Sequence, residues 1–296
     1  MKEKPFSKYQ ILANAVMIIW TLAIILPFIL LFMSSITDEN TLVANGYSFF
    51  PKKFSLASYS YIIKSGGQIL KAYGVSIGVT VVGTLLNVLL SALMAYPLSV
   101  KNLPGRNVMM FFVFFTMLFN GGIVPSYIMW TGTFHIKDTI FAQLLPNFLL
   151  SAWNVMMIRT YFTTRIPDGL YEAAEIDGAS QFTIFWKIVL PLGKPILVTM
   201  GTFAGLAYWN DWTNGLYYIV KNTGLYNVQN LLNQMVQNIQ FLTQSSNSNV
   251  TAAASTIPAT GIQMAIAFVA ILPIMLIFPS FQKYYAKGIA LGAVKG

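Results

Sequence analysis

The chain has 296 residues, of which 56% are hydrophobic and only 9% charged, and its formal net charge is +9. Soluble domains carry roughly 25% charged residues, so the composition excludes an ordinary soluble fold and indicates a membrane protein. The absence of cysteine excludes disulfides and thiolate metal sites, and one histidine, His135, leaves little for a zinc site. The basic residues lie between apolar runs, which favours the charge bias of membrane proteins over nucleic-acid binding.

Six apolar segments are long enough to cross a bilayer, for which a helix needs about 20 residues. They cover residues 11–33, 73–98, 108–130, 139–161, 195–218 and 256–280. The first is too long for the apolar region of a signal peptide, so we expect it to be retained. The sequence therefore predicts an all-α protein with a transmembrane domain of six helices over residues 11–280.

The third and fourth segments contain helix breakers. They are Asn120, Gly121, Gly122 and Pro125 in the third, and Pro146, Asn147, Trp153 and Asn154 in the fourth. Broken helices are tolerated at membrane depth where protein or a watery cavity takes up the freed backbone groups. We therefore expect both segments to face the interior of the bundle.

The distribution of lysine and arginine predicts the orientation. These residues are more frequent in 1–10, 99–107, 162–194 and 281–296 than in the alternate connections. The bias places both termini in the cytoplasm, with 1–10 as the N-terminus, 162–194 as a loop and 281–296 as the tail. Residues 34–72 and 220–255 then form long outside loops.

The second outside loop begins with an amphipathic pattern and ends in a polar run. Leu231, Leu232, Met235, Ile239 and Leu242 recur at helical spacing. The polar run consists of Gln244, Ser245, Ser246, Asn247, Ser248 and Asn249. We expect a helix followed by a flexible loop.

The cytoplasmic loop contains signals for two short helices over residues 166–192. Asp168 and Ser180 are residue types that cap helix N-termini, and Gly178 suits a left-handed turn between the helices. Pro191 is expected to end the second helix.

Each of these helices has a distinct surface. The second presents an apolar face, predicted to comprise Phe182, Phe185, Trp186 and Val189. The first presents a smooth face, predicted to comprise Leu170, Ala173 and Ala174 beside Glu172 and Glu175. An amphipathic pair on the membrane surface is the alternative, but such helices usually carry basic polar faces. The acidic rim therefore favours docking to a protein.

This loop resembles the EAA loop of the MetI-like permeases of ATP-binding-cassette importers. The similar residues are Glu172-Ala-Ala-Glu-Ile-Asp-Gly178-Ala179, followed by Phe182, Ile188, Leu190-Pro191 and Pro195. Trp209-Asn210-Asp211 with Gly215-Leu216, and the basic end 282–296, resemble the maltose-type sugar permeases. Ala95-Tyr-Pro-Leu-Ser99 and Asn120-Gly-Gly-Ile-Val-Pro125 are similar to a branch for complex oligosaccharides and polysaccharides.

The resemblance implies a six-helix permease subunit in a bacterial plasma membrane. It implies a second homologous permease, two cytoplasmic ATPases that use ATP and Mg, and an extracytoplasmic solute-binding protein that delivers a carbohydrate. The residues expected to couple to the ATPase are Glu172, Ala173, Ala174, Asp177, Gly178, Phe182 and Pro191. The chain contains no phosphate-binding loop, so we expect no cofactor and no catalytic group of its own.

Candidate pathway residues lie in the fourth and fifth segments and at the break in the third. They are Asn120, Asn147, Trp153, Asn154, Tyr208, Trp209, Asn210 and Asp211. Asp211 could equally have a structural role. The asparagines could instead join helices, and an interfacial belt explains the aromatics better than sugar stacking does.

Gly74 and Gly78 form a GxxxG pair that would permit close helix packing.

The polar run 244–249 is the candidate contact for the solute-binding protein. A secondary transporter and a permease for a non-sugar solute are the alternative functions. Secondary transporters commonly show internal repeats and midplane charges, neither of which is evident. An intramembrane enzyme would need paired acids or a nucleophile with a base, and only Asp211 is available.

Overall fold

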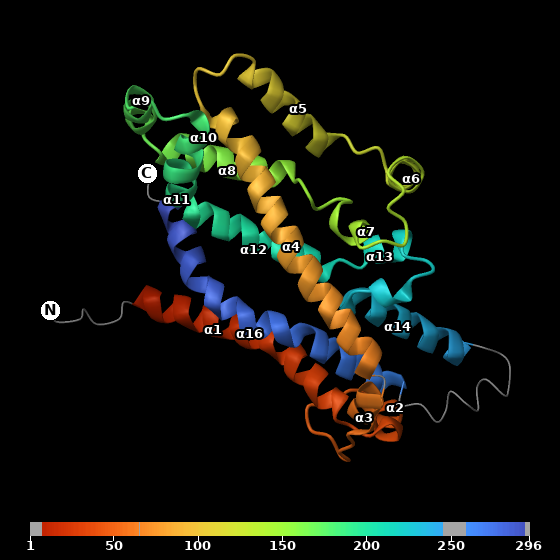
Figure 1. The fold of residues 1–296 in the computed structure, drawn as a ribbon. Coiled ribbons are helices and arrows are strands. Elements are labelled where there is room, and N and C mark those ends of the chain that lie inside the picture. Colours follow the sequence, from red (N-terminus) through yellow and green to blue (C-terminus); the bar gives the residue numbers. More distant parts are fainter. Residues whose placement is uncertain (1–7, 65, 245–258, 294–296) are drawn as a thin grey trace. The chain divides into compact units, whose positions relative to one another are not determined.

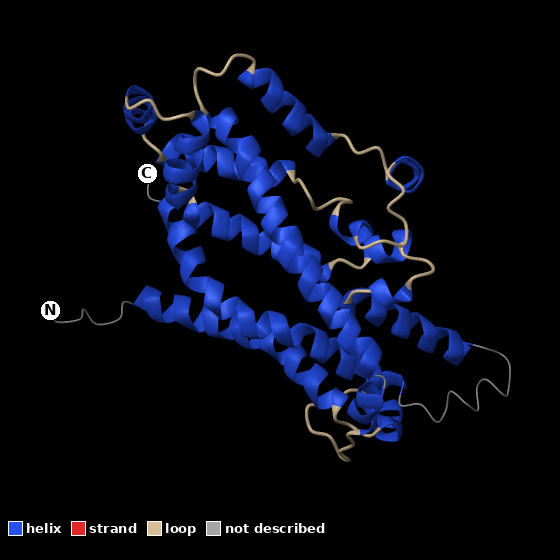
Figure 2. Ribbon diagram, in the orientation of Figure 1, coloured by secondary structure: helices blue, strands red, loops and turns tan. Residues whose placement is uncertain are grey.

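The protein consists of helices and connecting loops, as Figures 1 and 2 show. The structure, a computed structural model, describes residues 8–64, 66–244 and 259–293. Within these ranges there is no β-strand, and one isolated antiparallel bridge joins Thr37 to Phe54. The chain divides into two compact units, Met1–Ile69 with Leu232–Pro273, and Leu70–Leu231 with Ile274–Gly296.

The first unit combines the N-terminal helices with two later ones. It contains α1 (Lys8–Ser35), α2 (Glu39–Asn45), α3 (Ala57–Lys64), the start of α4 (Gly66–Ser99), most of α14 (Val228–Gln244) and the first part of α16 (Ala259–Ala293). Ile62 of α3 packs with Ile262 and Ile266 of α16, and the rings of Phe32 and Phe268 lie 4.9 Å apart. The helix predicted at the start of 220–255 is confirmed as α14.

The second unit contains the remainder of α4 and a series of shorter helices. These are α5 (Arg106–Leu118), α6 (Ile123–Ile128), the π-helical η1 (Met129–Thr133), α7 (Phe141–Leu144), α8 (Ala152–Arg165), α9 (Asp168–Ile176), α10 (Gln181–Ile184), the π-helical η2 (Phe185–Val189), α11 (Leu190–Leu192), α12 (Lys194–Asn210), α13 (Thr213–Tyr218) and the 3₁₀ turn η3 (Thr223–Leu225). Its main core joins Ala92 and Ala95 of α4 to Ile158 and Phe162 of α8 and Met200 of α12.

Among the residues that the structure describes, three helices are long and apolar enough to cross a membrane as single pieces: α1, α4 and Thr260–Ile277 of α16. Two further spans are possible if bent pairs count, namely Arg106–Leu118 with Ile123–Thr133, bent by 110°, and Gln181–Leu192 with Lys194–Asn210, bent by 79°. The predicted break in the third segment is thus confirmed.

The fourth and fifth predicted segments are not continuous helices. In 139–161, α7 and α8 are separated by residues 145–151, where Pro146 lacks a backbone donor and Asn147 adopts a φ of 68°. In 195–218, α12 ends at Asn210 and α13 begins at Thr213. The break predicted at Pro146 and Asn147 is therefore confirmed, whereas Trp153 and Asn154 lie inside α8 and do not interrupt it. The prediction of one continuous helix over 195–218 is wrong at residues 211–212.

Helices α4 and α12 approach closely at a glycine. A Cβ atom on Gly83 would lie 2.5 Å from Cζ of Tyr208, which is closer than side-chain atoms pack. The predicted packing role of Gly74 and Gly78 is not seen, because a Cβ atom there would have no neighbour within 4 Å in the described chain.

Candidate functional site

The loop of residues 166–192, here called the docking loop after its predicted role, contains the predicted turn and one predicted cap. Gly178 has a φ of 77°, the left-handed conformation expected after α9. The Ser180 hydroxyl accepts a hydrogen bond from the Thr183 backbone N–H at 3.2 Å, which confirms it as the N-cap of α10.

Two other expectations for this loop are wrong. Pro167 occupies the N-cap position of α9, so Asp168 is the first helical residue and its carboxylate instead pairs with the Lys101 ammonium. Pro191 does not end the second helix, which continues to Leu192. The π-helical turn η2 lies just before Pro191. A π-helical turn inside an α-helix is a local irregularity of the backbone, and here the helix continues past it.

The predicted apolar face of the second helix is divided between core and surface. Phe185 and Val189 are buried together with Ile184. Phe182 and Trp186 contact each other, with ring centroids 6.1 Å apart, but remain 66% and 45% exposed. The docking loop therefore has an exposed aromatic pair beside its packed side.

Helix α9 presents an acidic outer surface. Glu172, Ala173 and Asp177 are exposed, whereas Ala174 packs against the core. The predicted smooth face is therefore wrong for Ala174, because this side chain faces the unit's interior. Burial raises the pKa of the neighbouring Tyr171 hydroxyl, which stays neutral at physiological pH.

Side-chain bonds tie the docking loop to the end of α4. The Tyr96 hydroxyl donates to Oε1 of Gln181 at 2.5 Å, and Nε2 of Gln181 donates to Oε1 of Glu175 at 2.7 Å. The Tyr96 ring also lies 5.5 Å from that of Phe185. Together with the Lys101–Asp168 pair, these contacts join α9 and α10 to a long membrane-type helix.

A buried amide cluster lies in the second unit, and sequence patterns did not identify most of its members. It comprises Gln143, Asp211, Asn214, Asn227 and Asn230. Nε2 of Gln143 donates to Oδ1 of Asn230 at 3.3 Å, and Nδ2 of Asn227 donates to Oε1 of Gln143 at 3.3 Å. Asn227 also donates to the backbone oxygen of Asp211 at 2.6 Å. The cluster connects α7, the α12–α13 break and α14.

Asp211 stabilises the break between α12 and α13. Its Oδ1 accepts from the backbone N–H and the hydroxyl of Thr213 at 3.0 and 2.7 Å, and from the Asn214 backbone N–H at 3.3 Å. This is the local bonding by which aspartate competes with helix continuation. Asp211 therefore has a structural role at this break. A structural role does not exclude a second role in lining the pathway, which stays a prediction.

The remaining pathway candidates occupy different environments. Nδ2 of Asn154 donates to Oδ1 of Asn87 at 2.7 Å, which joins α8 to α4. The buried Tyr208 hydroxyl donates to the Leu144 carbonyl at 2.9 Å. Asn147 donates to Oδ1 of Asn214 at 3.3 Å. Trp209 is buried, whereas Asn120, Trp153 and Asn210 are exposed. Their roles in transport stay predictions.

A cavity of about 550 Å³ lies beside α4. It is lined by Lys71, Gly74, Val75, Gly78, Val79, Val82, Ile140, Leu144 and Gly224. None of the candidate pathway residues lines it. Its lining is mostly apolar and includes three glycines, so it presents few polar groups for recognising a sugar.

The candidate contact for the binding protein falls largely outside the described residues. Gln244 is the last residue of α14, and Ser245, Ser246, Asn247, Ser248 and Asn249 lie in the range 245–258.

Residues 72–291 match the family model described as binding-protein-dependent transport system inner membrane component. The chain is 36% identical to Protein LplC of Bacillus subtilis (strain 168), over 92% of this chain and 90% of that one. It is also 36% identical to the polygalacturonan/rhamnogalacturonan transport system permease protein YtcP of the same organism, over 97% and 98% of the two chains.

The fold agrees with a solved transporter structure. A bacterial ABC transporter involved in the import of the acidic polysaccharide alginate superposes with a TM-score of 0.79 at 26% identity, covering 95% of this chain and 100% of that one. The matched residues 72–291 include the docking loop, the amide cluster and the glycine contact at α4. The chain therefore belongs to the family of binding-protein-dependent transport system inner membrane components, the membrane subunits of ABC importers.

Proposed function

We propose that the chain is the permease subunit of an importer for an oligosaccharide or polysaccharide fragment. The observation that carries the proposal is the docking loop, which is exposed at Glu172 and Phe182 and bonded to α4 through Gln181. Such a surface suits a partner that drives movement, since force applied at α9 reaches a long helix through short polar contacts.

The proposed topology has six spans, with both termini and the docking loop in the cytoplasm of a bacterial cell. The bent pairs and the α7–α8 segment then count as broken spans, whose freed backbone groups are satisfied within the protein. The amide cluster supports this interpretation, because it supplies side-chain donors to carbonyl groups at the breaks.

The partners follow from this arrangement. Two ATPase subunits bind ATP and Mg and dock on this loop and on that of a second, homologous permease. A solute-binding protein delivers the sugar on the other side, and Gln244–Asn249 is the proposed contact. ATP binding closes the ATPases, the docking loops move with them, and the pathway alternates between the two sides of the membrane.

The carbohydrate class rests on relatives whose names give sugar polymers or oligosaccharides as substrates. YtcP is described for polygalacturonan and rhamnogalacturonan, and the AraQ protein of Bacillus subtilis for arabinooligosaccharides, at 26% identity over 98% of both chains. We propose a plant-wall-type or related oligosaccharide for this chain.

Docking is tested by co-purification of the ATPase with variants of the exposed residues. Phe182→Ala combined with Glu172→Ala removes the outward contacts without disturbing the buried side, so we expect loss of ATPase recovery. Phe241→Ala is the matched control, because Phe241 is 72% exposed on α14 while Phe182 is 66% exposed. Full ATPase recovery with the double variant would refute docking at this surface.

The transport function is tested with the assembled complex in vesicles. We expect uptake of the sugar that co-purifies with the binding protein, identified by mass spectrometry, and we expect this uptake to require ATP. Uptake driven by an ion gradient without ATP would favour a secondary transporter. A non-carbohydrate ligand on the binding protein would refute the substrate class and leave the docking result intact.

A further inference from the structure

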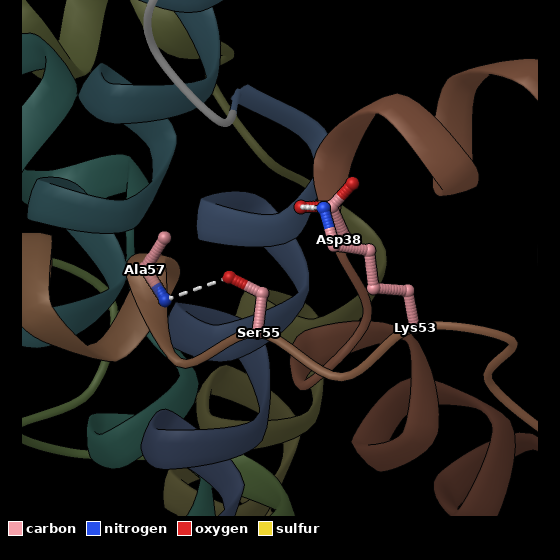
Figure 3. Close-up of polar contacts among 4 residues, drawn as sticks. All are labelled: Asp38, Lys53, Ser55 and Ala57. Atoms are coloured by element: carbon pink, nitrogen blue, oxygen red, sulfur yellow. Dashed lines mark hydrogen bonds and ion pairs between the residues drawn. The ribbon is translucent and has the colours of Figure 1, made fainter.

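The connection between α1 and α3 is folded against the end of α1. The Asp38 backbone N–H donates to the Lys53 carbonyl at 3.0 Å, and the Ser55 N–H donates to the Ile36 carbonyl at 2.9 Å. These two bonds flank the bridge between Thr37 and Phe54. Figure 3 shows the adjoining polar contacts, in which the Lys53 ammonium lies 3.4 Å from Oδ1 of Asp38 and the Ala57 N–H donates to Oγ of Ser55 at 3.2 Å.

The bridge holds this segment level with the end of α1. Helix α1 is apolar until Met33 and ends at Ser35. Thr37 follows by two residues, which is about 3 Å along a helix axis, and its hydroxyl still bonds to the Met33 carbonyl at 2.6 Å. Phe54 therefore lies beside the point at which the apolar stretch of α1 ends.

The same segment exposes a row of apolar and aromatic side chains. These are Val43, Tyr47, Phe49, Phe50, Phe54 and Leu56. Phe50 is 86% exposed, and Phe54 and Leu56 are each 68% exposed. Leu42 of α2 is buried, whereas every side chain of the row is at least 39% exposed among the described residues. The row follows directly in sequence on α1, whose apolar side chains are also exposed.

The charges of the segment leave a basic outer surface. Asp38 is paired with Lys53. The Glu39 carboxylate accepts from the backbone N–H groups of Thr260 and Gly261 at 2.8 Å each, at the start of α16. Both acids therefore face partners in the protein, while Lys52 is exposed beside the aromatics. Aromatic rings with adjacent lysines are the combination that favours the headgroup region, where lysine reaches the phosphates.

We propose that residues 43–56 are a membrane anchor that inserts Tyr47, Phe50 and Phe54 into the headgroup region of the leaflet where α1 ends. The anchor would fix the depth and tilt of α1. The proposal does not depend on which solute the transporter carries. A protein partner on the same surface is the competing explanation, which the following experiment separates.

The absence of cysteine makes the test direct, because a single introduced thiol can be labelled. Phe50→Cys and Leu56→Cys are labelled with bimane in the full chain, assembled with its partner subunits in phosphatidylglycerol–phosphatidylcholine vesicles. Ile25→Cys, on the exposed mid-section of α1, gives the reference for a deep lipid position. The unsubstituted complex gives the labelling background. Quenching is measured with lipids spin-labelled at the headgroup or near the acyl-chain end, and with aqueous iodide.

We expect the labels at positions 50 and 56 to lose fluorescence with headgroup spin labels more than with deep ones, and the label at position 25 to show the reverse. Strong iodide quenching without lipid quenching would show a free aqueous loop and overturn the proposal. Protection from both quenchers would show that protein covers the segment, and would also overturn it. Two labelled positions guard against a local disturbance at either one.

Discussion

The contact between Gly83 and Tyr208 depends on the absence of a side chain. The Tyr208 ring occupies the space above Gly83, and its hydroxyl bonds to the Leu144 carbonyl at 2.9 Å, so the ring cannot retreat without losing that bond. Gly83 thus permits the close approach of α4 and α12 at Tyr208, whose hydroxyl also bonds to α7.

Gly83→Ala is therefore expected to lower stability by about 1–3 kcal/mol, the usual cost of overpacking a filled site. Thermal unfolding of the purified protein in detergent measures this loss. Gly78→Ala is the matched control on the same helix, because a Cβ atom there meets nothing within 4 Å. Equal melting temperatures for the two variants would contradict the contact.

Asp138 provides a pH-dependent contact at a single residue. Its Oδ1 accepts from the backbone N–H groups of Val220 and Lys221 at 2.7 Å each and of Asn222 at 3.2 Å. The hydrogen bond from Lys221, followed by those from Val220 and Asn222, lowers the pKa of this carboxyl below its ordinary value. Because the folded pKa is depressed, the stabilisation is complete above the unfolded pKa of about 4 and disappears as the pH falls through the folded pKa.

Asp138→Asn should consequently melt below the unsubstituted protein at neutral pH. The difference should be constant between about pH 5 and 8 and shrink below about pH 4, where the carboxylate itself becomes protonated. Melting curves of both proteins across this range test the sign. A difference that persists unchanged in acid would assign the effect to shape and not to charge.

Among the elements, the docking loop depends most on one polar side chain. Gln181 is the first residue of α10 and bonds to both Tyr96 and Glu175. It therefore connects α4, α9 and α10, while Phe182 beside it points outward. Gln181 is itself exposed, so a change there acts on the link between docking and the membrane helices while leaving the Glu172 and Phe182 side chains in place.

Gln181→Ala should leave ATPase co-purification intact and reduce the stimulation of ATP hydrolysis by substrate-loaded binding protein. The two lost hydrogen bonds are worth about 0.5–1.5 kcal/mol each, enough for a several-fold loss of stimulation. Gln181→Glu keeps an acceptor for Tyr96 but loses the donor to Glu175, so an intermediate result is expected. Loss of the ATPase from the Gln181→Ala complex would instead place this residue in the docking surface.

Sequence periodicity predicted the helices that have an unambiguous apolar stripe or cap. α14 was predicted from its leucines, and the α9–α10 turn from Gly178 and Ser180. The prediction of one apolar face of four residues on α10 and η2 was wrong. Apolar residues that pack in the core and apolar residues exposed on the surface follow the same helical spacing. Hydropathy alone does not separate Phe182 from Phe185.

The amide cluster could be predicted only in part, for a different reason. Asn227 and Asn230 lie 84 and 87 residues after Gln143 along the chain, and the three side chains meet through tertiary packing. Each is an ordinary polar residue in its local sequence. Asp211 was singled out because an acid in an apolar run is unusual, but its Asx-type bonding depends on the helix break at its own position.

At the scale of the whole molecule, the first unit is discontinuous in sequence. Its N-terminal helices pack with residues 232–273, and Glu39 caps the start of α16 from α2. This single side chain therefore stabilises a contact between the two parts of the unit.

Glu39→Ala should expose the first turn of α16 by removing the acceptor for the Thr260 and Gly261 N–H groups. We expect a stability loss of about 0.5–2 kcal/mol, as for other caps, and faster hydrogen–deuterium exchange at residues 260–264. Asn40→Ala, at an exposed neighbouring position, is the control. Unchanged exchange in the Glu39 variant would refute the cap.

The contact of Glu39 with Thr260 also has a consequence for biogenesis, since the two residues are 221 positions apart. Synthesis proceeds from the N-terminus, so α1 and the segment after it enter the bilayer long before α16 has been translated. Until then Glu39 lacks its two N–H donors, and Ile62 of α3 lacks Ile262 and Ile266 as packing partners. Truncated chains that stop before α16 should therefore be the preferred substrates of membrane quality-control proteases.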